Sequence, residues 1–358
     1  MKTKYFNIPL LMLPNRWDGI AFLLIVGVLT LLAQGATEMH APIKVLEQAP
    51  ISLDPANLPD YALRTVMRMF AAIAASLVFT FVYATVAAKS RHAEMVMIPV
   101  LDILQSVPVL GFISFTVAFF LGLFPGNIMG AELASIFAIF TSQAWNMTFT
   151  FYQSLRSVPH DMDEVSRSFR FSSWQRFWKL EVPFAMPSLI WNMMMSMSGG
   201  WFFVVASEAI TVGDTSVMLP GIGSYMALAL TERNLGAIGY AIMVMFLVIL
   251  IYDQLLFRPL LAWAEKFRME REGPEHDAYS WVLRLLQRTR LLKIAVMPFA
   301  AAARVIGRWR WPKLRMPVHL ENPRLARMAD MLWLGIVLIV AAWITWRTGD
   351  YVFRFLTV

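Results

Sequence analysis

Two carboxylates lie inside long apolar runs of the sequence, where an ionised group is costly. Asp102 lies in the first turns of the apolar run 96–123, and Glu208 lies near the end of a later run. A charge surrounded by hydrocarbon has to be paired, neutralised or hydrated, so such residues are candidates for binding a solute or carrying a proton. Asp102 could instead pair with Lys89 or Arg91, and Glu208 could cap or brace the Gly213 loop. The sequence leaves both alternatives open.

Small polar side chains recur at helical spacing within the apolar runs. In the run 185–212 they step by four, four and three positions, which places them in a narrow sector of one helix face. Such a stripe is typical of a seam where two membrane helices pack, but it could also line a path for a polar solute. With similar residues of other runs, the candidates for such a path are Gln105, Ser142, Asn146, Ser188, Asn192, Ser196, Gly199 and Glu208.

No known constellation of catalytic residues is present in the sequence. It lacks a Gly-x-x-x-x-Gly-Lys-Ser/Thr phosphate loop, a His-Glu-x-x-His zinc motif and a Gly-x-Ser-x-Gly nucleophile turn. There is no cysteine, and the five histidines are scattered between the apolar runs. We therefore expect no catalytic residue, no metal site and no cofactor, and we predict that the chain is not an enzyme.

Residues 159–187, PHDMDEVSRSFRFSSWQRFWKLEVPFAMP, form a charged, amphipathic stretch between two apolar runs. Pro159 suits the first turn of a helix, and the acidic residues after it lie where the helix dipole favours carboxylates. Ser172 and Gln175 have the spacing of a capping box, so a second helix is expected to begin there and to end at Val182-Pro183. By pattern alone, the stretch could be a pair of helices that rest on lipid headgroups.

The composition is that of a membrane protein with several spans. The 358 residues are 58% hydrophobic and 15% charged, with a mean hydropathy of +0.58; these values are unusual for a soluble domain. Apolar runs that could cross a hydrocarbon core of about 30 Å recur along the chain. We predict an all-α integral membrane protein with spans at 20–33, 63–88, 96–123, 131–151, 185–212, 237–257 and 331–346.

The basic residues lie between these runs and predict which side each segment faces. Lys and Arg collect at the amino terminus, at 89–91 and at 156–179, whereas the alternate segments hold few, with Arg64 and Arg68 at a membrane edge. Because segments rich in Lys and Arg stay on the cytoplasmic side, the amino terminus and the 159–187 segment are predicted to be cytoplasmic. Topology accounts for the net charge of +7, so no nucleic-acid partner is expected.

The 159–187 segment resembles the cytoplasmic "EAA" loop of bacterial ABC importer permeases. The likeness is carried by Glu164-Val165-Ser166, by Arg170 and by Val182-Pro183, where the family has Glu-Ala-Ala, a Gly and a Leu-Pro pair. In that family the loop is a coupling helix that seats in a groove of the ATPase subunit. The resemblance implies that the ATPase-coupling residues are Asp163, Glu164, Val165, Ser166, Phe169 and Arg170.

Arg170 departs from the family pattern, which has Gly at this position, and Val165 and Ser166 stand where Ala is usual. An Arg held in a left-handed conformation costs about 1 kcal/mol or more. We therefore expect either that the turn is built differently in this chain or that docking of the loop is altered.

The stretch from Glu208 through Gly223 resembles the corresponding part of permeases for nitrate, sulfonate, taurine and bicarbonate. Those permeases share an acidic residue here and a Gly-x-Gly loop after it, and the likeness extends over about residues 61–258. It implies a small oxyanion as the transported solute. Because no Lys or Arg lies in the middle of a predicted span, hydroxyl and amide donors would have to bind the anion.

The resemblance implies a six-helix type I ABC importer permease core with one additional C-terminal transmembrane helix. Residues 1–60 hold an anchor span and a periplasmic segment, and residues 61–258 form the core, with its coupling loop at 157–183. Residues 259–329 form a basic cytoplasmic linker, and residues 330–358 hold a last span. The first span could be a cleaved signal, but prolines in its long leading segment favour an anchor. The last could open a second permease half or complete a seven-span protein.

We therefore expect a permease subunit of an ATP-driven importer in the bacterial inner membrane. Its expected partners are an ABC ATPase subunit dimer, a periplasmic or lipid-anchored solute-binding protein, a second permease half or a second copy of the chain, and membrane lipids. The basic linker could contact the ATPase, or could lie on anionic headgroups. One alternative is a secondary transporter driven by an ion gradient, with Asp102 or Glu208 as its proton site. Another is a membrane scaffold without transport activity.

Overall fold

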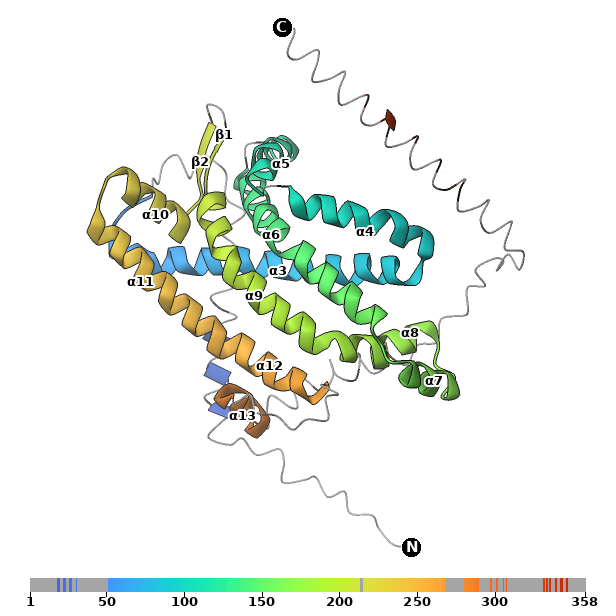
Figure 1. The fold of residues 1–358 in the computed structure, drawn as a ribbon. Coiled ribbons are helices and arrows are strands. Elements are labelled where there is room, and N and C mark those ends of the chain that lie inside the picture. The colour runs from blue at the N-terminus through green and yellow to red at the C-terminus, as the bar shows by residue number, and fades with distance from the viewer. Residues whose placement is uncertain are drawn as a thin grey trace, which may run out of the picture.

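The computed structural model describes residues 51–267 apart from 108, 126 and 213–214, the segment 280–289, and isolated residues within 18–30, 297–307 and 331–346. The described part is a bundle of helices with one two-stranded hairpin (Figure 1). The predicted spans 20–33 and 331–346 and most of the linker 259–329 lie outside it.

Eleven α-helices are described, and several are short. They are α3 (Leu58–Lys89), α4 (Arg91–Ser106), α5 (Val109–Leu123), α6 (Ile128–Arg156), α7 (His160–Ser168), α8 (Ser173–Arg176), α9 (Val182–Glu208), α10 (Ile222–Thr231), α11 (Leu235–Tyr252), α12 (Arg258–Ala264) and α13 (Trp281–Arg288). Short 3-10 turns lie at Pro55–Asn57 and Glu265–Phe267, and π-turns lie at Phe177–Glu181 and Asp253–Phe257. The strands β1 (Ala209–Val212) and β2 (Thr215–Met218) pair antiparallel.

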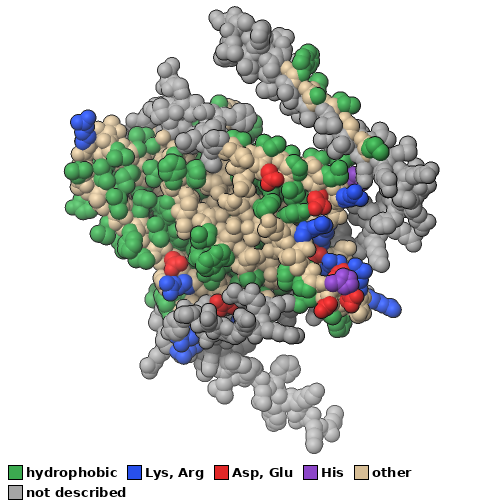
Figure 2. Space-filling model, viewed as in Figure 1, with side chains coloured by type: hydrophobic (Ala, Val, Ile, Leu, Met, Phe, Trp, Pro, Cys, Tyr) green, Lys and Arg blue, Asp and Glu red, His purple; other side chains and the backbone are tan. Residues whose placement is uncertain are grey.

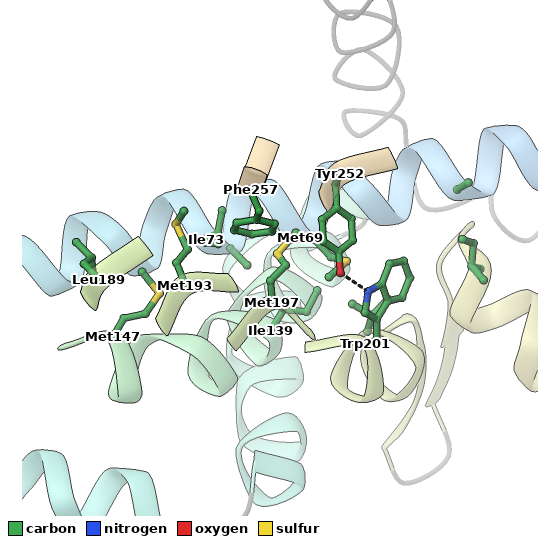
Figure 3. Close-up of a cluster of buried hydrophobic side chains, with 14 of the residues drawn as sticks. Met69, Ile73, Ile139, Met147, Leu189, Met193, Met197, Trp201, Tyr252 and Phe257 are labelled. Carbon is green, nitrogen blue, oxygen red and sulfur yellow. Dashed lines mark hydrogen bonds between the residues drawn. The ribbon is translucent and has the colours of Figure 1, made fainter. Parts of the chain in front are cut away.

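Helix α6 lies at the centre of the bundle and packs against α3, α5 and α9. Gly130 lets α5 approach it, since a Cβ there would lie 2.8 Å from the carbonyl oxygen of Phe120. The main core combines methionines of α3, α6 and α9 with aromatic residues of α9 and the π-turn region (Figure 3). Trp201 donates its indole N–H to the Tyr252 hydroxyl at 3.1 Å, so this buried N–H has a hydrogen-bond partner within the core.

Three described helical segments are long and apolar enough to cross a membrane, namely Pro55–Lys89, Ser173–Glu208 and Leu235–Phe267. Helix α6 has 29 residues and would extend over about 43 Å at 1.5 Å per residue, but it is not among these three. Its place in the middle of the bundle explains this, because a helix surrounded by other helices does not need an apolar surface toward lipid. The spans predicted at 63–88 and 131–151 are therefore confirmed as helices.

The single span predicted for residues 96–123 is wrong, because the run forms two helices. Helix α4 ends at Ser106 and α5 begins at Val109. Val107 between them is extended, with φ −73° and ψ 128°, as expected for a residue whose α conformation is blocked by a following proline. Helix α4 packs mainly on α3 and α5 mainly on α6, and the two point in different directions (Figure 1).

The boundaries of the fifth predicted span, 185–212, also differ from the structure. Helix α9 ends at Glu208, and β1 takes the last four residues of the predicted run. The short helix that begins near Ser172 was also predicted to end at Val182-Pro183, and this prediction is wrong because the helix continues into α9. The Val182 N–H donates to the Phe177 carbonyl, which closes a π-turn, and Pro183 lies in the first turn of α9, where a proline is tolerated. One continuous helical segment therefore extends from Ser173 to Glu208.

We call the end of the bundle that carries α7 and α8 the loop end, and the end that carries β1 and β2 the hairpin end (Figure 1). Helix α9 connects these two ends. Helix α3 also connects them, since Lys89 lies near the α8–α9 junction and Arg68 contacts Glu208.

Candidate functional site

A buried ion cluster at the hairpin end joins three helices through Arg68 of α3. The Arg68 Nε and Nη2 atoms donate to the two carboxylate oxygens of Glu132 in α6 at 2.5 and 2.6 Å, and Nη1 donates to Glu208 in α9 at 2.8 Å. None of the three side chains is more than 2% exposed. We call this group the Arg68 cluster. A paired contact between a guanidinium and a carboxylate is strong and directional, so it fixes how the helices lie against one another.

The Glu208 carboxylate also holds the loop that leads into α10. It accepts hydrogen bonds from the Thr65 hydroxyl and from the Gly223 N–H, both at 2.7 Å. Glycine is required in this loop, because a Cβ at Gly221 would lie 2.3 Å from the Glu208 carboxylate. Glu208 therefore has a structural role at the start of α10. The predicted contact with the Gly213 loop stays a prediction, because residues 213–214 lie outside the described part of the chain. Glu208 has no exposed surface, so it does not line an open path in this structure.

Sequence reasoning missed two members of this cluster. It placed Arg68 at a membrane edge and gave it no partner, but Arg68 is fully buried between two carboxylates. It did not single out Glu132. The available signal was the presence of opposite charges in two apolar runs, 63–88 and 131–151, which can both be buried only if they pair.

The polar stripes on α6 and α9 lie along an antiparallel contact between these two helices. The hydroxyls of Ser154 and Ser188 lie 2.8 Å apart near the loop end, and the Ser135 hydroxyl donates to that of Ser207 at 3.0 Å near the hairpin end. These two pairs fix the register of the helices.

The predicted path residues of α6 and α9 face outward from the chain in this register. Asn146, Ser188 and Gly199 are exposed, and Ser142, Asn192 and Ser196 are half-buried. A Cβ at Gly199 would meet nothing within 4 Å. The structure therefore leaves these six residues of α6 and α9 at least partly exposed, and we call them the polar seam. Two other candidates lie elsewhere, since Gln105 is exposed on α4 and Glu208 is in the Arg68 cluster.

Asp102 is exposed on α4, and it forms no ion pair among those that the structure describes. Lys89, one of its two predicted partners, pairs instead with Glu181 at 3.0 Å. The prediction of an Asp102–Lys89 pair is therefore wrong. The reason is geometric: α4 leads away from the end of α3, and the α8–α9 junction packs against that end (Figure 1).

At the loop end, α7 and α8 form the two short helices that the sequence predicts. Pro159 is the N-cap residue of α7 and not part of its first turn. The capping box is confirmed, because the Ser172 hydroxyl accepts from the Gln175 N–H at 3.2 Å and the Gln175 side chain accepts from the Ser172 N–H at 3.1 Å. Charged side chains gather over this part of the molecule (Figure 2).

Arg170 adopts the left-handed conformation that the family pattern reserves for Gly, with φ +50°. Its N–H donates to the Arg167 carbonyl at 2.8 Å, and the Phe171 N–H donates to the Ser166 carbonyl at 3.1 Å. This is the hydrogen-bond pattern of a Schellman motif, which ends a helix with one left-handed residue. The idea that the turn is built differently in this chain is therefore wrong: the turn is kept, and Arg170 bears the strain.

The predicted coupling residues divide into an exposed and an inward-facing group. The side chains of Val165 and Phe169 are 54% and 68% exposed, and Glu164 and Arg170 are exposed beside them. Ser166 is buried and donates to the Asp163 carbonyl at 2.8 Å. An exposed apolar pair on a short charged helix is a feature of docking surfaces.

Asp163 instead faces the protein and takes part in a set of ion pairs. Its carboxylate lies 2.7 Å from Arg167 and 2.5 Å from Arg176. A cavity of about 470 Å³ opens beside it, between the ends of α3 and α6 and the two short helices; its charged lining residues are Lys89, Arg156, His160, Asp163, Arg176 and Glu181.

Comparison with known proteins identifies the class. The model of the family described as "Binding-protein-dependent transport system inner membrane component" matches residues 76–256, half of the chain. The chain belongs to this family. It is a membrane-embedded ABC importer permease, a transport component and not an enzyme, and the predicted resemblance is confirmed. The number of spans remains a prediction.

Three similar proteins come from different transport systems. The nitrate import permease protein NrtB of Synechocystis is 23% identical over 247 residues, which is 66% of this chain and 84% of that protein. The bicarbonate transport system permease protein CmpB of Synechococcus elongatus is 24% identical over 134 residues, 37% of this chain and 45% of that protein. The glycine betaine/proline betaine permease protein ProW of Escherichia coli is 31% identical over 162 residues, 45% of this chain and 42% of that protein.

Replacement of Arg68 should strongly destabilise the bundle. Arg68→Met leaves two buried carboxylates without a counter-charge, so we expect a loss of about 3–5 kcal/mol in the free energy of unfolding. Arg258→Met removes a surface pair with Asp253 in which the arginine is 54% exposed, and should cost less than about 1 kcal/mol. Thermal unfolding of both purified variants in detergent tests this, and equal midpoints would contradict the structural role of Arg68.

Replacement of Arg170 by glycine should stabilise the turn after α7. Arg170→Gly relieves the left-handed strain, which is worth about 1 kcal/mol, and should slow hydrogen exchange of the Phe171 amide several-fold. Ser168→Gly, at a helical position two residues earlier, should speed the same exchange because glycine weakens a helix by about 0.5–1 kcal/mol. Faster exchange in Arg170→Gly would show that the turn does not need a positive φ.

Proposed function

We propose that this chain is the permease subunit of an importer that moves a small oxyanion, driven by a separate ATPase that grips residues 159–187. The observation that carries this proposal is the exposed apolar pair Val165 and Phe169 on α7, a charged helix at one end of a membrane bundle. Full burial of an apolar side chain of this size is worth about 1.5–3 kcal/mol, so the pair would contribute to the binding of a partner.

The loop end is proposed to face the cytoplasm. The elements that meet at this end carry basic residues in their last turns, namely Lys89, Arg156, Arg167, Arg176 and Lys179. Such clusters mark the cytoplasmic side of a membrane protein. The amino terminus is proposed to lie on the same side. The organisation predicted from the sequence is kept as part of the proposal: a six-helix core at 61–258, preceded by an anchor span and followed by the basic linker and a last span.

Helix continuity supports a mechanical role for the loop. Because α8, the π-turn and α9 form one helical segment from Ser173 to Glu208, a displacement of the loop moves α9 along its whole length. Helix α9 carries four of the six residues of the polar seam, so closure of the ATPase pair around nucleotide would shift the seam between its inward-open and outward-open states. Glu164 and Arg170, exposed beside the apolar pair, are proposed to orient docking by charge.

The polar seam is proposed to line the translocation path. Exposed amides such as that of Asn146 would lack hydrogen-bond partners in lipid, which costs several kcal/mol for each group. The seam is therefore expected to face water, covered by a second permease half or a second copy of the chain. Arg68 is buried and paired, so the seam would bind an anion through hydroxyl and amide donors, with the low affinity that release requires.

The choice of an oxyanion rests on NrtB and CmpB, which are named for nitrate and bicarbonate. A separate ATPase dimer and a solute-binding protein are the proposed partners. The alternative of proton-driven transport through Glu208 has little support, since its carboxylate is held by Arg68, Thr65 and Gly223 and has no contact with solvent.

Phe169→Asp should release the ATPase without unfolding the permease, because the side chain is exposed. With the ATPase and binding protein in proteoliposomes, we expect at least a tenfold loss of ATP-dependent nitrate uptake and of copurified ATPase. Ser168→Asp adds the same charge one residue earlier, about 100° away around the helix, and should leave both within twofold. Normal uptake with Phe169→Asp would show that the ATPase does not drive transport through residues 159–187.

Ser196→Leu should block uptake if the polar seam is the path. The leucine would occupy the outward-facing surface of α9, so flux should fall more than tenfold while the assembled complex keeps its thermal stability. Ser198→Leu, exposed on the same helix but about 200° away, is the matched control and should transport normally. If Ser196→Leu instead dissociates the permease pair, the seam is a packing surface and not a path.

A further inference from the structure

Glu181 lies at the junction of the loop and the membrane helices. It is the last residue of the π-turn Phe177–Glu181, and its side chain is 7% exposed. One carboxylate oxygen lies 3.0 Å from the Lys89 ammonium at the end of α3, and the other lies 3.0 Å from the Arg176 guanidinium at the end of α8. A nearly buried carboxylate therefore bridges cations from two separate elements.

The series of ion pairs continues into α7, the helix that we propose docks on the ATPase and therefore call the docking helix. Arg176 also contacts Asp163 of α7, whose second partner is Arg167. Each of the two carboxylates, Asp163 and Glu181, is thus flanked by two cations, and the pairs run from α7 through α8 to α3. The carboxylates are only 13% and 7% exposed, so water and salt screen these contacts less than they screen surface pairs.

The π-turn directs Glu181 toward α3. A π-turn adds one residue to a helical turn, which changes the direction of the following side chains by about 100°. Trp178 of the same turn lies near Phe81 of α3, with ring centroids 6.4 Å apart, and the Lys89 ammonium lies 5.1 Å from the centre of the Phe177 ring. Aromatic contacts of this kind tolerate sliding, whereas the two ion pairs of Glu181 hold opposite charges of α3 and α8 close to one carboxylate.

We propose that Glu181 is a positioning residue that ties the docking loop to α3, so that loop movement reaches two membrane helices and not α9 alone. This rests on the proposed coupling role of the loop. Helix α3 also carries Arg68, which precedes Lys89 by 21 residues and so lies about 30 Å away at 1.5 Å per residue. The tie therefore connects the loop, through α3, with the Arg68 cluster at the hairpin end.

A distance measurement on the permease alone tests the tie without the ATPase. The chain has no native cysteine, so spin labels can be placed at two introduced cysteines, Ser168→Cys on α7 and Val86→Cys on α3, both exposed positions. In lipid nanodiscs we expect a narrow distance distribution that broadens in Glu181→Gln and in Lys89→Met. Lys89→Arg should keep it narrow because the charge is retained. Asp253→Asn is the control, since Asp253 lies in the other π-turn and its described partners, Gln254 and Arg258, are near neighbours in the chain.

The same variants in the full complex test transmission. With Glu181→Gln and Lys89→Met we expect normal copurification and hydrolysis by the ATPase, with about tenfold less uptake for each ATP hydrolysed. An unchanged distance distribution in both variants overturns the tie, and a broadened distribution with normal uptake per ATP overturns its role in transport. These outcomes are distinct from a failure of the proposed ATPase docking at residues 159–187. That failure would appear as normal ATPase copurification with the Phe169→Asp variant.

Discussion

An arginine remains charged when it is buried, so Arg68 needs its counter-charges in every state that the bundle visits. Glu132 and Glu208 supply them, and through these contacts α3, α6, α9 and the loop before α10 are fixed to one another at the hairpin end. The glycines of that loop are a consequence, because the Glu208 carboxylate leaves no room for a Cβ at Gly221. The rest of the bundle is then free to move mainly at the loop end.

The loop end has the opposite physical character. Its ion pairs involve cations that are 34% to 73% exposed, they lie beside a cavity of about 470 Å³, and they involve residues on four short or terminal elements. Contacts of this kind rearrange at lower cost than a dry cluster. A rigid hairpin end and an adjustable loop end, joined by two continuous helices, form an arrangement that can convert a push on α7 into a tilt of α3 and α9.

Sequence patterns were sufficient for features that depend on local chemistry. The capping box at Ser172, the helix at 63–88 and the amphipathic pair of short helices follow from spacing that neighbouring residues determine. Features that depend on partners far away in the chain were not accessible: the pairing of Arg68 with Glu132, and that of Lys89 with Glu181, need the packing of α3 on α6 and on the α8–α9 junction. The helix across Val182-Pro183 was missed because proline was taken as a stop, although a π-turn places it where no N–H is needed.

The most direct test of the account is a site-specific crosslink from the docking helix to the ATPase in working membranes. Phe169→Cys introduces one thiol into a chain without cysteine, and a short thiol-reactive crosslinker can be added to inverted membrane vesicles during ATP-driven uptake. The account predicts a crosslink to the ATPase subunit that forms only from the cytoplasmic face and inhibits uptake. A thiol that reacts only from the opposite face, or that never reaches the ATPase while uptake continues, would contradict it.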